Sequence, residues 1–165
     1  MSIKEAMKGY FQKRKVIIQE AEHSFIFEGE ADEKGYISWM PVEMACAHNS
    51  VEKEIGFPLH PSIIEYFHSY WFMDLDGFFN KYYISLESVV PNTELCSFRE
   101  KLEMYRKSHN GRLDHIPIGI EGNGLLVVID NDSGAVQLED FEVGSFDVIA
   151  SSIEELISGF TLEKS

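Results

Sequence analysis

Apolar residues recur every three to four positions along several segments of the chain, which is the spacing of the buried face of an amphipathic helix. Ile3, Met7 and Phe11 show it within the first fifteen residues, and a basic cluster at Lys13–Lys15 then suits a solvated helix C-terminus. A second run begins at Pro61, a residue tolerated in the first helical turn. Its stripe predicts a core helix that includes Ile63, Ile64, Phe67, Tyr70 and Trp71.

Two later segments carry helix start and stop signals. Asn92 or Thr93 can cap a helix, and Asn110-Gly111 favours the left-handed backbone that ends one. Ser152, with Glu155 three residues later, has the pattern of a capping box and predicts a closing helix. The buried stripe of the earlier helix is expected to contain Leu95, Phe98, Leu102 and Tyr105.

Strand signals lie between these helical segments. Ser24–Glu28 and Tyr36–Trp39 are rich in aromatic and β-branched residues on either side of a polar turn, which predicts a hairpin. A short helix is expected around Ser50–Ile55. Asp74–Gly77 has the composition of a turn, and Phe78–Leu86 is predicted to form one strand that leaves it.

After residue 114 the pattern changes to short apolar segments separated by Gly, Asn, Asp and Ser, which is typical of tight hairpins. Together with the helices, these segments indicate the α+β class: a single domain over residues 1–165 with an antiparallel-rich (mixed) β-sheet packed against several helices. The four strands of the predicted meander are His115–Ile120, Gly124–Asp130, Ala135–Glu139 and Phe146–Ala150.

Charge is distributed unevenly along the sequence. The formal net charge is −14, and residues 115–165 hold ten acidic side chains and one basic side chain. Residues 21–98 are also acidic, whereas residues 1–20 and 99–114 carry a small positive charge. An acidic chain repels phosphate backbones, so direct nucleic-acid binding is disfavoured and a basic protein partner is favoured. Acidity that serves solubility alone is the alternative explanation.

Motifs of catalysis and metal binding are absent or incomplete in the sequence. It has no His-Glu-x-x-His, no phosphate-binding loop and no Gly-x-Ser-x-Gly, and the Glu65–His68 pair is only half of a di-iron signature. Asp130–Gly134 imitates a calcium loop, but Ala135 and Phe141 stand where Gly and Glu are needed, so a hairpin turn is predicted. We predict no catalytic residue, metal or cofactor; an enzyme whose site is assembled from distant residues is the minority hypothesis.

The sequence also indicates in which cellular compartment the protein is expected. It has no apolar run approaching the roughly 20 residues of a membrane-spanning helix and no secretion signal, so a cytoplasmic protein is expected. Cys46 and Cys96 are the two cysteines, and they are expected to be reduced thiols within the packing.

Several short motifs occur along the chain in an order that is more informative than any one of them. In chain order they are a Trp-x-Pro strand end at Trp39–Pro41, a Pro-started aromatic helix within Phe57–Phe67, a turn at Asp76-Gly77, a strand at Lys81–Leu86, a long helix at Phe98–Leu102, a Pro-containing strand at His115–Ile120, a Ser-Gly hairpin at Asp132–Val136 and a closing helix at Ser152–Phe160. In this order they resemble the Syd family of the SUKH superfamily. The likeness covers residues 36–162, and residues 1–35 are a divergent N-terminal helix and strand.

This resemblance implies a non-enzymatic α+β domain that binds another protein. The superfamily includes many bacterial immunity proteins that neutralise protein toxins, often nucleases, while Syd-type members bind cytosolic loops of the SecY channel. Both kinds of partner are typically basic, so an acidic surface suits either. We favour an immunity protein for a basic, nuclease-type toxin domain, because the N-terminal third diverges and the charge is strongly negative; SecY binding is the alternative.

Acidic residues at predicted turns and strand edges are the candidate contacts with such a partner. For any one of them, a plainly solvated carboxylate is the more common role. Tyr82 and Tyr83 are included because neighbours in a strand point to opposite faces, so one of them faces the solvent or a partner. Trp39 and Trp71 are expected to be buried. The candidates are Asp74, Asp76, Tyr82, Tyr83, Asp130, Asp132, Glu139, Asp140 and Glu142.

Overall fold

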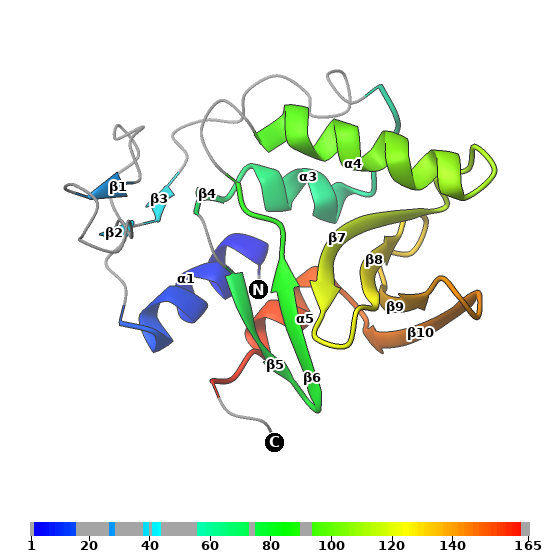
Figure 1. The fold of residues 1–165 in the computed structure, drawn as a ribbon. Coiled ribbons are helices and arrows are strands. Elements are labelled where there is room, and N and C mark those ends of the chain that lie inside the picture. Colours follow the sequence, from blue (N-terminus) through cyan, green and yellow to red (C-terminus); the bar gives the residue numbers. More distant parts are fainter. Residues whose placement is uncertain are drawn as a thin grey trace, which may run out of the picture.

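Six antiparallel strands form a curled sheet in the order β10-β9-β8-β7-β6-β5 (Figure 1). The computed structural model describes residues 2–15, 27–28, 38–39, 41–43, 56–72, 75–89 and 94–162. The predicted α+β class is confirmed, and so is the antiparallel meander after residue 114. The strands are β5 (Leu75–Phe79), β6 (Tyr82–Leu86), β7 (His115–Glu121), β8 (Leu126–Asp130), β9 (Val136–Asp140) and β10 (Ser145–Ala150).

Glycines with positive φ close two turns of the meander. Gly134 (φ 82°) follows β8 and Gly144 (φ 77°) follows β9. The N–H of Gly134 donates to the carbonyl of Asp130 at 2.8 Å, and that of Gly144 donates to the carbonyl of Asp140 at 2.7 Å. Glycine adopts this conformation without a steric penalty, which is why the turn composition located these strands correctly.

The predicted single strand at Phe78–Leu86 is wrong, because the segment contains a turn at Asn80 and Lys81 between β5 and β6. Asn80 has a φ of 54°, a value that Asn tolerates better than most residues. The predicted turn at Asp74–Gly77 is also wrong, because Leu75–Gly77 lies inside β5. Space is limited at this glycine, since a Cβ would lie 3.0 Å from the Cβ of Phe160, which would then have to shift by a few tenths of an ångström.

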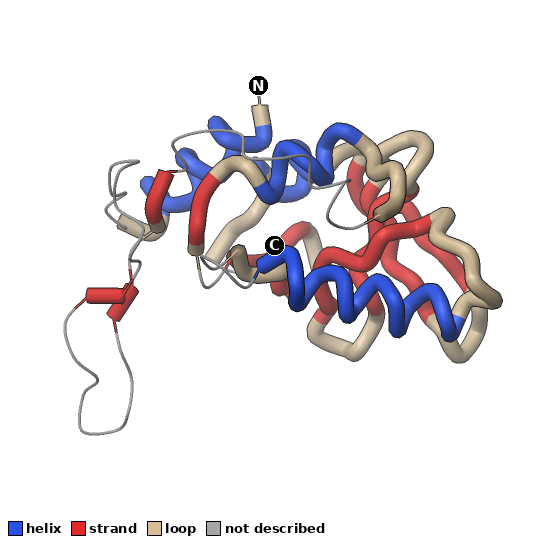
Figure 2. The backbone as a smooth tube through the Cα atoms, turned by 90° about the horizontal axis from the view of Figure 1, so that it is seen from above, coloured by secondary structure: helices blue, strands red, loops and turns tan. Residues whose placement is uncertain are grey.

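Helices lie on both sides of the sheet (Figure 2). The structure describes α1 (Ile3–Lys13), α3 (Pro61–Phe67), α4 (Glu94–Ser108) and α5 (Ile153–Ser158). Helices α1, α3 and α5 pack with one face of the sheet in the main hydrophobic core, to which Phe98 and Leu102 of α4 also contribute. Helix α4 lies on the opposite side, with Phe98 of its N-terminal half against Phe67 of α3 at a ring-centroid distance of 4.6 Å.

Among the described residues, the predicted helices are confirmed except for the end of the second one. In α1, the apolar stripe is buried as expected, and Asn110 and Gly111 adopt φ values of 56° and 78° after α4. Helix α3 ends at Phe67, however, because Tyr70–Trp71 forms a strand, β4, that pairs with β3 (Val42–Glu43). Pairing with a distant segment here overrides the helical spacing of the sequence.

The structure describes only part of the chain before residue 56. Here β1 (Phe27–Glu28) pairs antiparallel with β2 (Ser38–Trp39), which confirms the predicted hairpin at these residues. The remainder of that hairpin, the predicted helix at Ser50–Ile55, Cys46, and the capping residues Asn92 and Thr93 lie outside the described residues, as do the side chains of Trp39, Trp71, Leu95 and Cys96.

The outer edge of β5 is closed by the two ends of the chain. The Tyr10 hydroxyl donates to the carbonyl oxygen of Asp76 at 2.9 Å and accepts from its N–H at 3.0 Å, while the Arg14 guanidinium donates to the same carbonyl at 2.5 Å. Phe78 and Thr161 exchange two backbone hydrogen bonds of 2.9 Å. The basic cluster after α1 is therefore more than a solvated cap, because Arg14 has a structural role.

Candidate protein-binding surface

The side of the sheet that faces α4 carries a second packed region, separate from the main core. Val127 and Ile129 belong to the main core, and because strand neighbours alternate, Val128 points to the α4 side, where it is fully buried. Tyr105 of α4 is buried there as well. This region joins the C-terminal half of α4 to the middle of the sheet.

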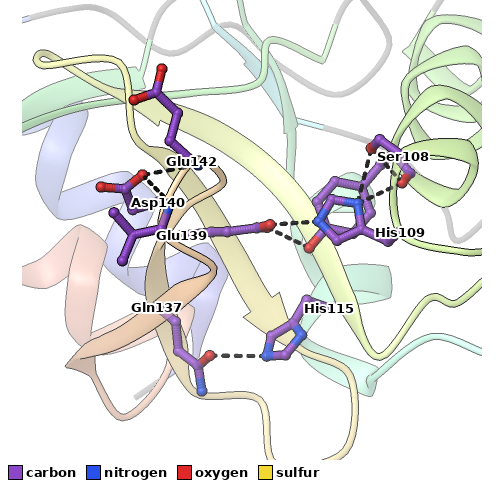
Figure 3. Close-up of polar contacts among 9 residues, drawn as sticks. Ser108, His109, His115, Gln137, Glu139, Asp140 and Glu142 are labelled. Carbon is purple, nitrogen blue, oxygen red and sulfur yellow. Dashed lines mark hydrogen bonds and ion pairs between the residues drawn. The ribbon is translucent and has the colours of Figure 1, made fainter.

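A buried carboxylate, Glu139, connects β9 to the end of α4. Its side chain is 2% exposed; the Tyr105 hydroxyl donates to its Oε1 at 2.5 Å, and His109 Nε2 lies 2.5 Å from its Oε2 (Figure 3). Burial, and secondly the hydrogen bond to the Glu139 carboxylate, raises the pKa of Tyr105 far above its ordinary value. Tyr105 therefore remains a donor at all physiological pH values.

The burial of Glu139 corrects the expectation that it contacts a partner. A carboxylate buried at this depth must be paired and hydrogen-bonded, and Tyr105 and His109 supply those contacts. Glu139 is thus an internal tie between β9 and α4. It holds the neighbouring β9–β10 hairpin in position and does not itself contact a protein partner.

Both ring nitrogens of His109 face oxygen acceptors. Nδ1 lies 2.7 Å from the carbonyl oxygen of Tyr105, and Nε2 faces the Glu139 carboxylate. A neutral imidazole has one N–H, so when Nδ1–H donates to the Tyr105 carbonyl, the contact at Nε2 needs a second proton between the ring and the Glu139 carboxyl. The imidazole also stacks on the Tyr105 ring at a centroid distance of 3.7 Å. The end of α4 is thereby fixed in position above β9.

Ser108, His109 and Glu139 have the composition of a nucleophile, base and acid, but their arrangement differs from that of a catalytic triad. The Ser108 hydroxyl lies 3.0 Å from His109 Nδ1 and donates to the Tyr105 carbonyl at 2.9 Å. Nδ1 also faces that carbonyl and so holds a proton already. It has no lone pair with which to accept a proton from Ser108.

The β9–β10 hairpin exposes an unusual amount of apolar surface between acidic side chains. Asp140 shapes the turn, because its Oδ1 accepts from the N–H groups of Glu142 and Val143 at 3.1 and 3.3 Å. We call the following residues the hairpin surface: Asp140, Phe141 (58% exposed), Glu142, Val143 (76%), Phe146 (37%), Asp147 and Val148 (63%).

Two aromatic contacts hold parts of the hairpin surface in place. His115 stacks on Phe146 at a centroid distance of 4.1 Å. The Nε2 atom of His115 also lies 3.0 Å from Gln137 Oε1 (Figure 3). At the other end, Phe141 lies 5.3 Å from the His109 ring. Apolar side chains that are fixed before binding lose less conformational entropy in a complex.

A groove of about 670 Å³ runs between α4 and the sheet, on the other side of the Glu139 tie from the hairpin surface. Its wall is largely apolar and includes Met104, Tyr105, Pro117, Ile120 and Leu126. Lys101 and Glu87 form an ion pair that lines it too. The groove and the hairpin surface are thus neighbouring parts of one side of the sheet.

The candidate residues on β5 and β6 behave as the strand pattern predicts. Tyr83 is 39% exposed and its hydroxyl donates to the Asp76 carboxylate, while Tyr82 is half-buried against the core. Tyr83 also packs edge-to-face on Phe78, at a centroid distance of 5.1 Å. Asp74 lies outside the described residues.

The candidates after β8 form the predicted hairpin turn. Asp130 Oδ1 accepts from the N–H groups of Asp132 and Ser133 at 2.9 and 3.1 Å. These backbone hydrogen bonds lower the pKa of the Asp130 carboxyl below its ordinary value. Asp130 is therefore a turn-forming residue, and Asp132 is an exposed carboxylate beside it.

The structure does not bring all the acidic candidates together. Asp130 and Asp132 precede β9, whereas Asp140 is its last residue and Glu142 follows it, so the two pairs lie at opposite ends of that strand. Only the second pair adjoins the exposed apolar side chains of the hairpin surface. Sequence reasoning missed those apolar residues, although the alternation of apolar and acidic residues from Asp140 to Val148 is a visible signal.

Two further features bear on function. In the described part of the chain, no three or more His, Cys, Asp or Glu side chains gather in a way that could hold a metal ion. Within the same residues, no helix has the length and apolar composition needed to cross a membrane.

Comparison with known proteins agrees with the motif order. The model of the Syd protein (SUKH-2) family matches residues 4–161, and so also includes α1, which the motifs noted above do not cover. No curated protein matches the sequence. Because the family match spans nearly the whole chain, the chain belongs to the Syd protein (SUKH-2) family.

Proposed function

We propose that the protein is an immunity protein that neutralises a bacterial toxin by binding its basic, nuclease-type domain. Membership of the Syd (SUKH-2) family supports a protein-binding role of the SUKH or Syd type. The observation that carries the specific proposal is the hairpin surface, where exposed apolar side chains alternate with acidic ones.

The charge of the surrounding surface supports a cationic partner. From His115 to Leu162 the sequence has nine acidic residues and no Lys or Arg. Glu121 and Glu139 are buried, and the other seven reach the surface. A nuclease domain presents Lys and Arg to phosphates, so an acidic surface without cations attracts that domain and accelerates association.

The apolar residues of the hairpin surface supply the dry centre of an interface, which charged residues alone do not provide. A stable interface has a dry centre with aromatic anchors, surrounded by polar groups. Phe141 and Phe146 are suitable anchors; Glu142 follows Phe141 in the turn, and Asp147 follows Phe146 in β10 with its side chain on the opposite face of the strand. Such a surface recognises a protein by shape as well as by charge.

The proposed activity needs no catalytic residue. The geometry around His109 supports this, because Nδ1 is a donor and leaves Ser108 without a base. The protein acts by occupying the partner's own cationic surface.

A regulator that binds the cytosolic loops of SecY is the alternative, and the match to the Syd family favours it. Such loops are rich in Lys and Arg, so they would use the same acidic surface. The two functions differ in the location of the partner: an immunity protein binds a toxin domain, and a Syd-type regulator binds membranes that contain the channel.

The proposal is tested by affinity capture from the native cytoplasm at low salt and at about 0.5 M salt, where exposed charges are screened. The wild-type protein is compared with Glu142→Lys/Asp147→Lys on the hairpin surface. The control, Glu5→Lys/Glu100→Lys, changes the charge equally at exposed positions of α1 and α4.

We expect the wild type and the control to retain a basic toxin domain whose toxicity co-expression abolishes, and the hairpin variant to lose it. Capture of SecY with its membrane would replace the immunity proposal with the Syd-type alternative. An empty capture at both salt concentrations would contradict protein binding and favour an enzyme.

A further inference from the structure

The two edges of the six-stranded sheet differ in how their backbone groups are satisfied. At the β5 edge, Asp76 is bonded by Tyr10 and Arg14, and Phe78 is bonded by Thr161. At the other edge, β10 pairs with β9 only. Within the described part of the chain, no backbone hydrogen bond reaches Ser145–Ala150 from the outer side. Alternate residues of such an edge strand direct their N–H and C=O groups into the solvent.

The usual protection of an exposed edge is weak at β10. Its sequence contains no Lys and no Pro, the residues that most often block pairing with another chain. A register irregularity between Val148 and Ala150 interrupts only its last part. Phe146 and Val148 are exposed on one side of the strand, and Asp147 is the one charged residue. Residues 145–148 therefore form a short, open template for another strand.

We infer that an extended segment of the partner adds to the sheet along residues 145–148 of β10, as a seventh strand. This inference rests on the proposed function and specifies how the partner is held. Main-chain hydrogen bonds would provide affinity, and alternate side chains of the added strand would provide specificity. The irregularity after Val148 limits the paired length to about four residues.

The chemistry of the surroundings identifies the segment. Its apolar residues would lie beside Phe146 and Val148, and its Lys or Arg residues would face Asp147 and Glu142. The occupant is therefore a cationic protein segment in which apolar and basic residues alternate. A second copy of this chain is disfavoured by charge, because two chains that each carry a formal net charge of −14 repel one another.

The test uses the full-length, ¹⁵N-labelled protein and a capped peptide of about eight residues in which Lys and Val alternate, the length of an ordinary strand. A second peptide has the same side chains and charge, but N-methyl groups on consecutive residues remove its N–H donors from both edges. Backbone hydrogen exchange is measured with each peptide at saturation and at low salt.

We expect the unmodified peptide to slow exchange about tenfold or more at amides within residues 145–148, because paired amides are protected. The methylated peptide is expected to bind at least about tenfold more weakly. Equal binding of the two peptides, protection confined to other residues, or no protection at saturation would each overturn the inference.

Failure of the strand-addition inference is distinguishable from failure of the proposed function. A captured toxin domain that leaves residues 145–148 unprotected would refute strand addition and keep the immunity proposal. Peptide pairing at β10 together with an empty capture at both salt concentrations would establish the open edge and refute the proposed function.

Discussion

The Tyr10 hydroxyl makes two hydrogen bonds with one residue of the sheet edge, donating to the carbonyl oxygen of Asp76 at 2.9 Å and accepting from its N–H at 3.0 Å. A single phenol thus occupies the place where a neighbouring strand would pair. Tyr10 is 5% exposed, so these bonds form away from water. Helix α1 is therefore tied to the sheet by polar contacts as well as by its apolar stripe.

Replacing Tyr10 with Phe should lower the free energy of unfolding by about 1–3 kcal/mol, the usual cost of leaving buried polar groups without partners. Urea denaturation measures this change. The control is Tyr82→Phe, because the half-buried Tyr82 hydroxyl makes no hydrogen bond to a residue that the structure describes. We expect the control to cost less than about 0.5 kcal/mol, and equal losses would contradict the role of Tyr10.

Glu139→Gln should destabilise the protein by about 1–3 kcal/mol, although the side chain keeps its size, because an amide cannot accept from both Tyr105 and His109 as the carboxylate does and leaves a buried contact unsatisfied. Denaturation of the single variants Glu139→Gln and His109→Asn and of the double variant gives their coupling energy. Coupling above about 1 kcal/mol is expected for residues in direct contact. Additive losses would show that the two side chains stabilise the fold independently.

The strands after residue 114 could be predicted because the local signals agree with the tertiary structure. Gly134 and Gly144 occupy turn positions with positive φ, and apolar segments of strand length separate them. The β5–β6 hairpin could not be predicted in the same way, since its turn at Asn80-Lys81 interrupts an aromatic run. Gly77 looks like a turn residue, but it serves the close approach of Phe160, which is more than eighty positions away.

The candidate surface was only partly predictable for the same reason. Turn composition correctly placed Asp140 and Glu142 at an exposed hairpin, because those residues act locally. The burial of Glu139 depends on Tyr105 and His109, which lie 34 and 30 positions earlier in the chain. No pattern within β9 distinguishes this carboxylate from the exposed one that follows it.

Asp130 should contribute stability that depends on pH. Backbone hydrogen bonds from Asp132 and Ser133 lower its pKa from the ordinary value of 3.8, so the folded state binds this proton less tightly than the unfolded chain. The stabilising contribution is therefore present above about pH 4 and is lost as the pH falls below 3.8 through the folded-state value. Because the Asp130 carboxylate is mostly accessible to solvent, screening keeps its contribution to the free energy of unfolding under about 1 kcal/mol.

Asp130→Asn tests this dependence, because the amide oxygen can still accept the turn hydrogen bonds while the charge is removed. Thermal unfolding of the variant and the wild type should differ between pH 5 and pH 7 and converge at acidic pH, below about pH 3. Asp132→Asn, at the exposed neighbour, serves as the control for a general loss of negative charge. A difference that stays constant down to the acid limit would contradict the assignment.

Gly119→Ala should destabilise the centre of the sheet by about 1–3 kcal/mol, the usual cost of forcing an extra carbon into a packed region. A Cβ at this position would overlap the backbone carbonyl oxygen of Ser85, so β6 and β7 would have to separate beside the groove. Urea denaturation measures the loss, and faster hydrogen exchange along β6 and β7 would locate it. Gly122→Ala is the matched control, since the atom nearest its Cβ, in the Tyr83 side chain, lies 3.5 Å away. Gly→Ala at an open site usually stabilises a protein by restricting the unfolded chain, so equal losses in the two variants would contradict a special role for the approach of the two strands.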